Sequence, residues 1–448
     1  MAGPSISLVR PRSRQPARIP VSNLPVVSGE PIVGAHAVRV LSHSAHAPPE
    51  CAAVQSGTHE ARLSNLQWKR DETDKHVVTL KGTVTSSAGR DRAVAPATRS
   101  GLRSGAVLAI AAAILALHAS VAAQSHESAA QWLGQRFGFT PSQLAAVDAG
   151  TPVAVVLPSS VDREIAVAGA VFVHATGARL VSVLQDVERL ESGGGFIRTR
   201  KLSEPPRLSD FAGFRLPAAD VEALRDCRPG RCDVKLGQSG FDLLAKLDWS
   251  APDAEARVNA LARQTSLDYV LAYRKGGNQK LAVYLDSDKP QSVGREFEEM
   301  IGRADLWPHA LTPLAEYFRG YPTAARPRQT SEFFYWSLAE FGLKPVFRIN
   351  HVVVHGTGRT SGLLHVVAVK QLYASHYFHA AFEVRAVVSD GRPPGKGVYL
   401  VMVNMARSDG LTGVLGGLII KPKATNGSRN GLERALAAVK RRAEAGRR

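Results

Sequence analysis

The fold expected of this chain follows from HYFHAAFEVRAVV at residues 376–388. Every second residue is apolar, as on one face of a β-strand, from Phe378 through Phe382 to Ala386. The opposite face is mostly polar and holds Tyr377, His379, Ala381, Glu383 and Arg385. Glu383 and Arg385 are neighbours on that face, so they are able to pair. A polar strand face either meets water or lines a cavity in which it orients a ligand.

Three more runs of β-type residues lie around it, at Lys344–His355, Leu363–Tyr373 and Val398–Arg407. Gly-rich or Pro-rich turns join two of the pairs, and short connections between long strands predict an antiparallel meander. A glycine-broken apolar run, Leu411–Ile420, follows. Gly431–Ala443 is expected to be an amphipathic helix with Leu432, Leu436 and Val439 on its apolar face. We therefore predict that residues 331–448 form an antiparallel meander closed by a C-terminal amphipathic helix.

Residues 124–325 are expected to be richer in helix and to contain a disulfide turn. The apolar spacing of Glu164–His174 predicts a strand that is buried on both faces. Helices are expected in two pieces over Gln124–Gly150 and at Arg179–Leu190, Pro217–Arg225, Pro252–Thr265, Gln291–Arg303 and Leu311–Tyr321, with strands at Phe196–Leu202 and Gln279–Asp286. A linker rich in Pro, Arg and Thr, Tyr321–Thr330, marks the expected boundary with the meander. The fold class expected for the whole is α+β.

Residues 99–123 decide which compartment is expected. Gly105–Ala123, GAVLAIAAAILALHASVAA, carries no charge and follows Arg99 and Arg103. A basic flank, an apolar core and closing small residues form the order of a secretory signal, with the mature chain starting near Gln124. A run of about 20 apolar residues also suffices for a single membrane anchor, and a buried helix of a soluble domain is the third interpretation. Both main interpretations place the rest of the chain in the periplasm or outside the cell.

Residues 1–98 stand before this segment and are rich in Pro, Ser, Arg and His. They are expected to be disordered, or to be non-native sequence ahead of a translation start that lies downstream of Met1. If they are native, they form a cytoplasmic arm. Residues 1–123 hold 14 Lys and Arg against 7 Asp and Glu, and this basic balance suits the cytoplasmic side of a membrane.

The whole chain of 448 residues has a net charge of +17. A basic surface attracts nucleic acid, anionic lipid or a polyanionic cell wall. Outside the cytoplasm we expect an anionic membrane or cell-wall surface as a partner, and no nucleic acid. The charge is scattered along the chain, so a merely solvated basic surface is the alternative.

Two of the three cysteines, Cys227 and Cys232, lie in the sequence CRPGRC. The Pro-Gly pair predicts a tight turn that brings the two sulfurs within bonding range. In an oxidising compartment these cysteines are expected to form a disulfide. Their spacer is longer than the two-residue spacer of thioredoxin-type redox sites, and the neighbouring Asp226 and Asp233 are poor partners for zinc.

Signatures of catalysis and of metal binding fail on their spacing. His351 and His355 are four residues apart, which is about 13 Å on a strand, and His376 and His379 point to opposite faces. Gly237–Phe241 misses the nucleophile-elbow pattern by one residue. We therefore expect no metal and no cofactor.

The order of elements over Lys344–Ala443 resembles the helix-grip arrangement of START-like domains, which include polyketide cyclases and lipid-transfer proteins. The resemblance implies a curved sheet that grips a helix around an apolar cavity for a lipid or another apolar small molecule. The residues expected to orient or contact such a ligand are Tyr373, Tyr377, Phe382, Glu383, Arg385 and Arg407.

Three functions stay open at this point. The first is an exported or membrane-anchored protein that binds a hydrophobic ligand without catalysis. The second is a periplasmic hydrolase whose catalytic residues meet only in the folded chain. The third is an envelope scaffold or interaction protein that uses its basic surface.

The signal interpretation predicts that the native protein starts near Gln124, because signal peptidase cleaves after small residues. N-terminal sequencing of protein isolated from its own cells should read residues from that point. Peptides from Pro4–Arg62 in the native protein would contradict the downstream start.

Overall fold

The computed structural model describes residues 129–303, 311–340, 344–358, 362–389 and 396–445. The leader at 1–98 and the apolar segment at 99–123 lie outside these residues, so the expectations placed on them stay predictions. Within the described ranges, no helix combines the length and the apolar character that a bilayer crossing requires.

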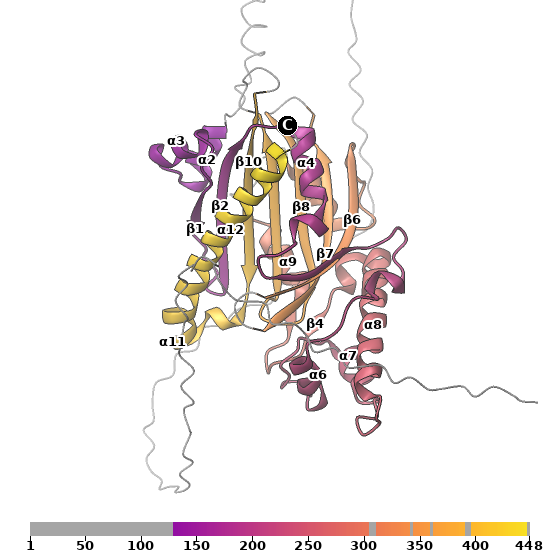
Figure 1. Ribbon diagram of the computed structural model, residues 1–448. Helices are drawn as coiled ribbons and strands as arrows, with labels where there is room; N and C mark the ends of the chain where they lie inside the picture. The colour runs from indigo at the N-terminus through magenta and orange to yellow at the C-terminus, as the bar shows by residue number, and fades with distance from the viewer. Residues whose placement is uncertain (1–128, 304–310, 341–343, 359–361, 390–395, 446–448) are drawn as a thin grey trace, which may run out of the picture. The chain divides into compact units, whose positions relative to one another are not determined.

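An antiparallel sheet of eight strands forms the centre of the described structure (Figure 1). Its strands are β1 (Val153–Leu157), β2 (Glu164–Val173), β3 (Phe196–Lys201), β6 (Thr330–Glu340), β7 (Pro345–Gly356), β8 (Leu363–Ala374), β9 (Ala380–Val388) and β10 (Val398–Arg407). They lie in the order β1-β2-β10-β9-β8-β7-β6-β3. The meander from β6 to β10 is therefore the middle of the sheet, and strands from earlier in the chain flank it. The combination of helices with an antiparallel sheet confirms the predicted α+β class.

Helices lie on both faces of this sheet (Figure 1). They are α2 (Ala129–Phe137), α3 (Pro141–Asp148), α4 (Gly177–Gln185), α5 (Val187–Leu190), α6 (Ala218–Arg225), α7 (Gln238–Leu244), α8 (Ala254–Gly276), α9 (Val293–Ile301), α10 (Thr312–Gly320), α11 (Gly413–Leu415) and α12 (Lys421–Glu444). Short 3-10 turns η1 (Leu208–Phe211), η2 (Gly277–Lys280) and η5 (Asp409–Leu411), a π-turn η6 (Gly416–Ile420), and a small pair of strands β4 (Val283–Tyr284) and β5 (Gln291–Ser292) complete the described elements.

The two faces of the sheet are packed differently. On the face turned to the viewer in Figure 1, α12 and α4 lie across the strands. Leu432 and Leu436 of α12 pack on Gly169 of β2, where a Cβ atom would come within 2.8 Å of the Leu436 side chain. On the opposite face, aromatic residues of α9 and α10, Phe297 and Phe318, pack on Phe382 of β9.

The two halves of the chain meet on β2. This strand is buried at all ten positions, as its two apolar faces predict. It pairs with β10 along its whole length, from Val173 opposite Val398 to Glu164 opposite Arg407. At the other side of the meander, β3 pairs with β6. The linker expected as a boundary at Tyr321–Thr330 thus lies between strands of a single sheet.

Some local predictions are wrong. The strand expected over Gln279–Asp286 is replaced by the turn η2 and the two-residue strand β4. The helix expected over Arg179–Leu190 breaks at Asp186, because the Asp186 side chain accepts a hydrogen bond from the Arg189 backbone N–H and starts α5 there.

One strand boundary also differs from expectation, and one strand is not predicted. The strand β9 begins at Ala380, whereas the sequence predicts a strand from His376. Tyr377 has a φ of 57°, a left-handed conformation that cannot continue a strand. The strand β6 is not predicted from the sequence, and its aromatic residues, Phe333–Trp336, are consecutive and show no alternation of apolar and polar positions.

A buried cluster of charges ties the ends of β2 and β10 to α9. Arg407 donates from Nε to Glu164 and from Nη1 to Glu296, each at 2.9 Å. Burial alone would lower the pKa of Arg407, but its carboxylate partners raise that pKa above the usual value. The same two carboxylates also face two further arginines, Arg303 and Arg163.

We predict that Arg407→Met lowers the free energy of unfolding by about 3 kcal/mol, because it leaves buried carboxylates without their main partner. Arg303 and Arg163 still face these carboxylates, which keeps the loss at that level. The control is Arg319→Met, which breaks an exposed pair with Glu298 and should cost under about 1 kcal/mol in urea unfolding. Equal losses for the two variants would contradict the role given to the buried cluster.

Candidate functional site

The six predicted ligand residues do not gather around one cavity. Tyr373 and Phe382 pack on the sheet face that α9 and α10 cover. Glu383 and Arg385 lie on the opposite face, because adjacent strand residues point to opposite sides. The other two lie elsewhere, Arg407 in the buried charge cluster and Tyr377 in the turn before β9.

Glu383 and Arg385 belong to a row of polar side chains that crosses five strands on the α12 face. Tyr335 pairs with Asn350, Asn350 with Gln371, and Glu383 with Asn404 in the register of the sheet. Gln371 and Glu383 are diagonal neighbours, because Glu383 pairs with Val369. We call this set the polar row; its members are Tyr335, Asn350, Gln371, Glu383, Arg385 and Asn404.

The polar row adjoins an apolar part of the same face. The strands that carry it continue into aliphatic side chains that pack in the core beneath α4 and α12. These are Val352, Val354, Val367, Val369, Val387 and Met402. One sheet face therefore carries polar side chains in one zone and apolar side chains in the next, and α4 and α12 cover the apolar zone.

Some polar groups of the row have hydrogen-bond partners within the protein. Arg385 donates two hydrogen bonds to Glu383, at 2.7 and 3.0 Å, which confirms the expected pairing. Burial alone would lower the pKa of Arg385, but the Glu383 carboxylate raises it above its usual value. The Tyr335 hydroxyl donates to Glu191 at 2.9 Å. Arg385 is thus a permanent cation held in a fixed orientation.

Four buried polar atoms of the row have no hydrogen-bond partner among the described residues. Three of them are donors, on Asn350 Nδ2, Gln371 Nε2 and Arg385 Nη1, and the fourth is the acceptor Asn404 Oδ1. Asn350 and Gln371 are each only 3% exposed, so bulk water does not replace the missing partners. Such groups cost about 1–3 kcal/mol each when they are left unpaired, so this row is a costly part of the sheet face.

The sequence did not reveal Tyr335, Asn350, Gln371 and Asn404 as site residues. Asn350, Gln371 and Asn404 lie in mostly apolar strands, and only the strand register shows that they share one face. Tyr335 lies in the strand that was not predicted.

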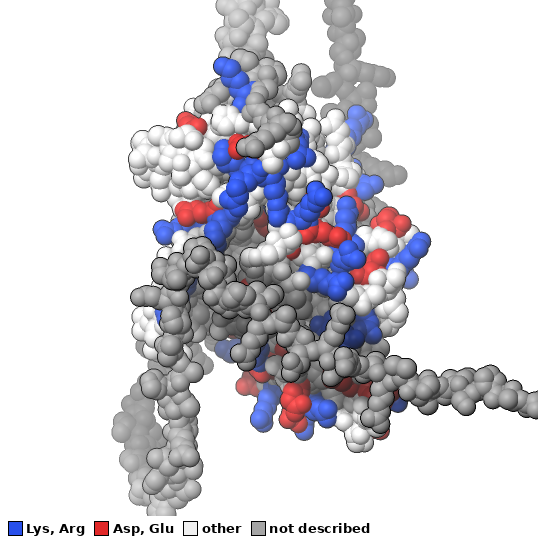
Figure 2. Space-filling view, in the orientation of Figure 1, with Lys and Arg blue, Asp and Glu red and all other residues white. Residues whose placement is uncertain are grey.

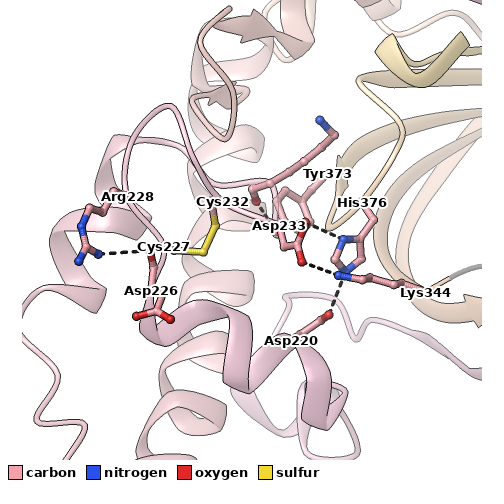
Figure 3. Close-up of a disulfide and its surroundings, with 10 residues drawn as sticks. Asp220, Asp226, Cys227, Arg228, Cys232, Asp233, Lys344, Tyr373 and His376 are labelled. Carbon is pink, nitrogen blue, oxygen red and sulfur yellow. Dashed lines mark hydrogen bonds and ion pairs between the residues drawn. A yellow bond between two sulfur atoms is a disulfide. The ribbon is translucent and has the colours of Figure 1, made fainter. Parts of the chain in front are cut away.

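A second candidate is a polar hollow of about 140 Å³ beside the disulfide (Figure 3). Cys227 and Cys232 are joined there, with their sulfurs 2.02 Å apart. The hollow is lined by Asp233, Lys235, Asp286, Lys344, His376 and Tyr377. Each of its lysines faces an aspartate, Lys344 with Asp233 at 2.6 Å and Lys235 with Asp286 at 3.1 Å.

Both ring nitrogens of His376, the histidine of this hollow, have hydrogen-bond partners in the protein (Figure 3). Its Nδ1 lies 2.9 Å from the Asp233 carbonyl oxygen, and its Nε2 lies 3.0 Å from the buried Asp220 carboxylate. Both ring nitrogens of His376 thus face an acceptor from the protein itself, and the group holds the disulfide loop against β8.

A third candidate is the buried amine of Lys370, on the face that α8, α9 and α10 cover. Its Nζ donates to Asn278 and lies 3.8 Å from the centre of the Phe297 ring. Burial lowers the pKa of Lys370 well below its usual value. A neutral amine is a nucleophile in principle, but this side chain is 0% exposed, so a substrate does not reach it in this conformation.

We predict that the unfolding free energy of the protein rises with pH toward pH 10 by up to about 1.4 kcal/mol per unit from Lys370 alone. The sign follows because the unfolded chain, with the usual lysine pKa of 10.5, binds a proton that the folded chain does not. Lys370→Met should remove this slope in urea unfolding, while Lys246→Met, at an exposed position, should keep it. An unchanged slope in Lys370→Met would show that the buried amine is charged.

Known proteins give no independent guide to the function. No protein-family model matches this chain, and neither does any curated protein or solved structure. The resemblance to START-like domains therefore stays a hypothesis, and the chain's own geometry carries the functional argument.

Proposed function

We propose that this chain is a binding protein, without catalysis, for an amphipathic molecule whose head is made of acceptor oxygens, such as a long-chain fatty acid. The observation that carries the proposal is the set of unpaired buried donors on Asn350, Gln371 and Arg385. The head of the ligand accepts hydrogen bonds from these groups. The unpaired acceptor Asn404 Oδ1 suits a hydroxyl or a water beside the head.

Binding requires α4 and α12, which pack on the apolar zone next to the polar row, to open and admit the chain of such a ligand. The helix-grip resemblance supports this orientation, because α12 and α4 lie on the same face as the row (Figure 1). In that arrangement the C-terminal helix closes the meander over the bound molecule. Of the residues expected from the sequence, Glu383 and Arg385 keep a role at the head, and the other four do not.

The surface charge favours an acidic head. Lys and Arg side chains gather on the same face, over α4 and the second half of α12 (Figure 2). The basic residues of these two helical segments include Arg179, Lys440, Arg441 and Arg442. A positive surface attracts an anionic ligand toward this face and raises the rate of association.

We further propose that binding takes place outside the cytoplasm. The disulfide between Cys227 and Cys232 supports an oxidising compartment. The chain acts there either free after cleavage near Gln124 or anchored through residues 105–123.

The test is the double substitution Asn350→Leu with Gln371→Leu. Removing two donors should weaken the binding of palmitate by about tenfold or more, and calorimetric titration measures this loss. The same substitutions should raise the free energy of unfolding by about 1–3 kcal/mol, because unpaired buried amides are removed. A ligand site loses palmitate affinity and gains stability in this variant, whereas polar groups with a structural role would lose stability.

Asn259→Leu is the matched control. Asn259 is also buried, but its side chain is satisfied by the Leu216 N–H and the Glu255 carbonyl. Its substitution should lower stability and leave palmitate affinity unchanged. If the wild type does not bind palmitate, or if the double variant gains stability and keeps its affinity, the polar row holds only water and the proposal fails.

A further inference from the structure

The turn between β10 and α12 presents large aliphatic side chains to solvent. We call residues 413–420, which comprise α11 and η6, the apolar tip. Five of its side chains are between 41% and 82% exposed: Val414, Leu415, Leu418, Ile419 and Ile420. Elsewhere in the described residues, large exposed aliphatic side chains are scattered over separate elements, as with Ile197 in β3 and Leu271 in α8. A contiguous cluster of this kind marks an interaction site.

The tip is held outward by fixed ends. On its N-terminal side Leu411 is buried in the core beneath α12. On its C-terminal side Lys421 donates from Nζ to the Asp162 carbonyl at 2.6 Å. Gly413 has a φ of 76°, which turns the chain out of β10 into α11. Figure 1 places α11 at the end of α12.

The chain that follows the tip is basic, whereas Asp409 lies on its N-terminal side. Between Asp409 and Glu433 the chain contains no acidic residue and three basic ones, Lys421, Lys423 and Arg429. Lys423 and Arg429 are exposed. An apolar cluster with a basic flank complements a surface that has negative charge outside and an apolar layer beneath, as an anionic lipid bilayer does.

We propose that the apolar tip inserts into the surface of an anionic lipid bilayer. A protein partner fits less well, because protein interfaces are enriched in aromatic, Met and Arg anchors, and the tip has none of these. A second copy fits less well too, because stable interfaces engage about 20–30 residues on each side. The aliphatic side chains replace water by acyl chains, and Lys423 and Arg429 meet the headgroups. This inference is independent of the ligand proposed for the polar row.

The experiment compares full-length variants in co-sedimentation with vesicles of phosphatidylcholine and phosphatidylglycerol. Leu415→Ser with Leu418→Ser should reduce the partition coefficient by about tenfold or more, because exposed apolar side chains contribute most of the insertion energy. Lys423→Glu should reduce it as well and weaken its dependence on salt. The control Ile197→Ser removes an exposed aliphatic side chain elsewhere and should leave partitioning unchanged.

The readout is the ratio of the partition coefficients of variant and wild type. Both proteins are full-length, so any contribution of residues 105–123 to vesicle binding is common to both. A ratio near one for the double serine variant would overturn the proposal. So would a wild-type dimer that becomes monomeric in that variant and does not bind vesicles, since a second copy would then be the occupant of the tip. Loss of binding to anionic vesicles, with pure phosphatidylcholine bound weakly by both proteins, would support it.

Discussion

The pairing of β2 with β10 is the constraint on which the rest of the structure depends. It joins residues that are far apart in the sequence: Glu164 pairs with Arg407, 243 positions away. Closing so large a loop costs conformational entropy, although this cost grows slowly with length. The offsetting contributions are a strand buried on both faces and the charge cluster at its end. Because β2 also carries Gly169, the same strand fixes where α12 lies and hence where the apolar tip emerges.

The unpaired polar groups of the polar row lower the stability of the sheet. Neighbouring strands place amides and a guanidinium on a face whose adjoining positions are valines and a methionine. Aliphatic residues at these positions would extend the core without unpaired groups. Arg385 shows how the fold limits the cost, because Glu383 neutralises its charge and leaves only Nη1 free. Unpaired donors of fixed orientation, beside an apolar surface, are the means by which a protein recognises the head of an amphipathic molecule.

Local sequence patterns predict parts of this structure. Alternation over ten residues predicted β2 and its double burial, and the two-residue spacing of Glu383 and Arg385 predicted their ion pair. The polar row was not readable, because Asn350, Gln371 and Asn404 become neighbours only through strand register, which one sequence does not specify. Tyr377 was misplaced for a different reason: its left-handed backbone is set by tertiary contacts, such as its hydroxyl accepting from the Lys344 N–H, and not by its own propensity.

The central claim is that a natural amphipathic molecule occupies the polar row. Native mass spectrometry of the protein, released without detergent from its own cells, addresses this most directly. The account predicts a population heavier than the polypeptide by the mass of one such molecule, which organic extraction removes and identifies. A single population at the mass of the polypeptide, from cells in which the protein is folded and disulfide-bonded, would contradict it.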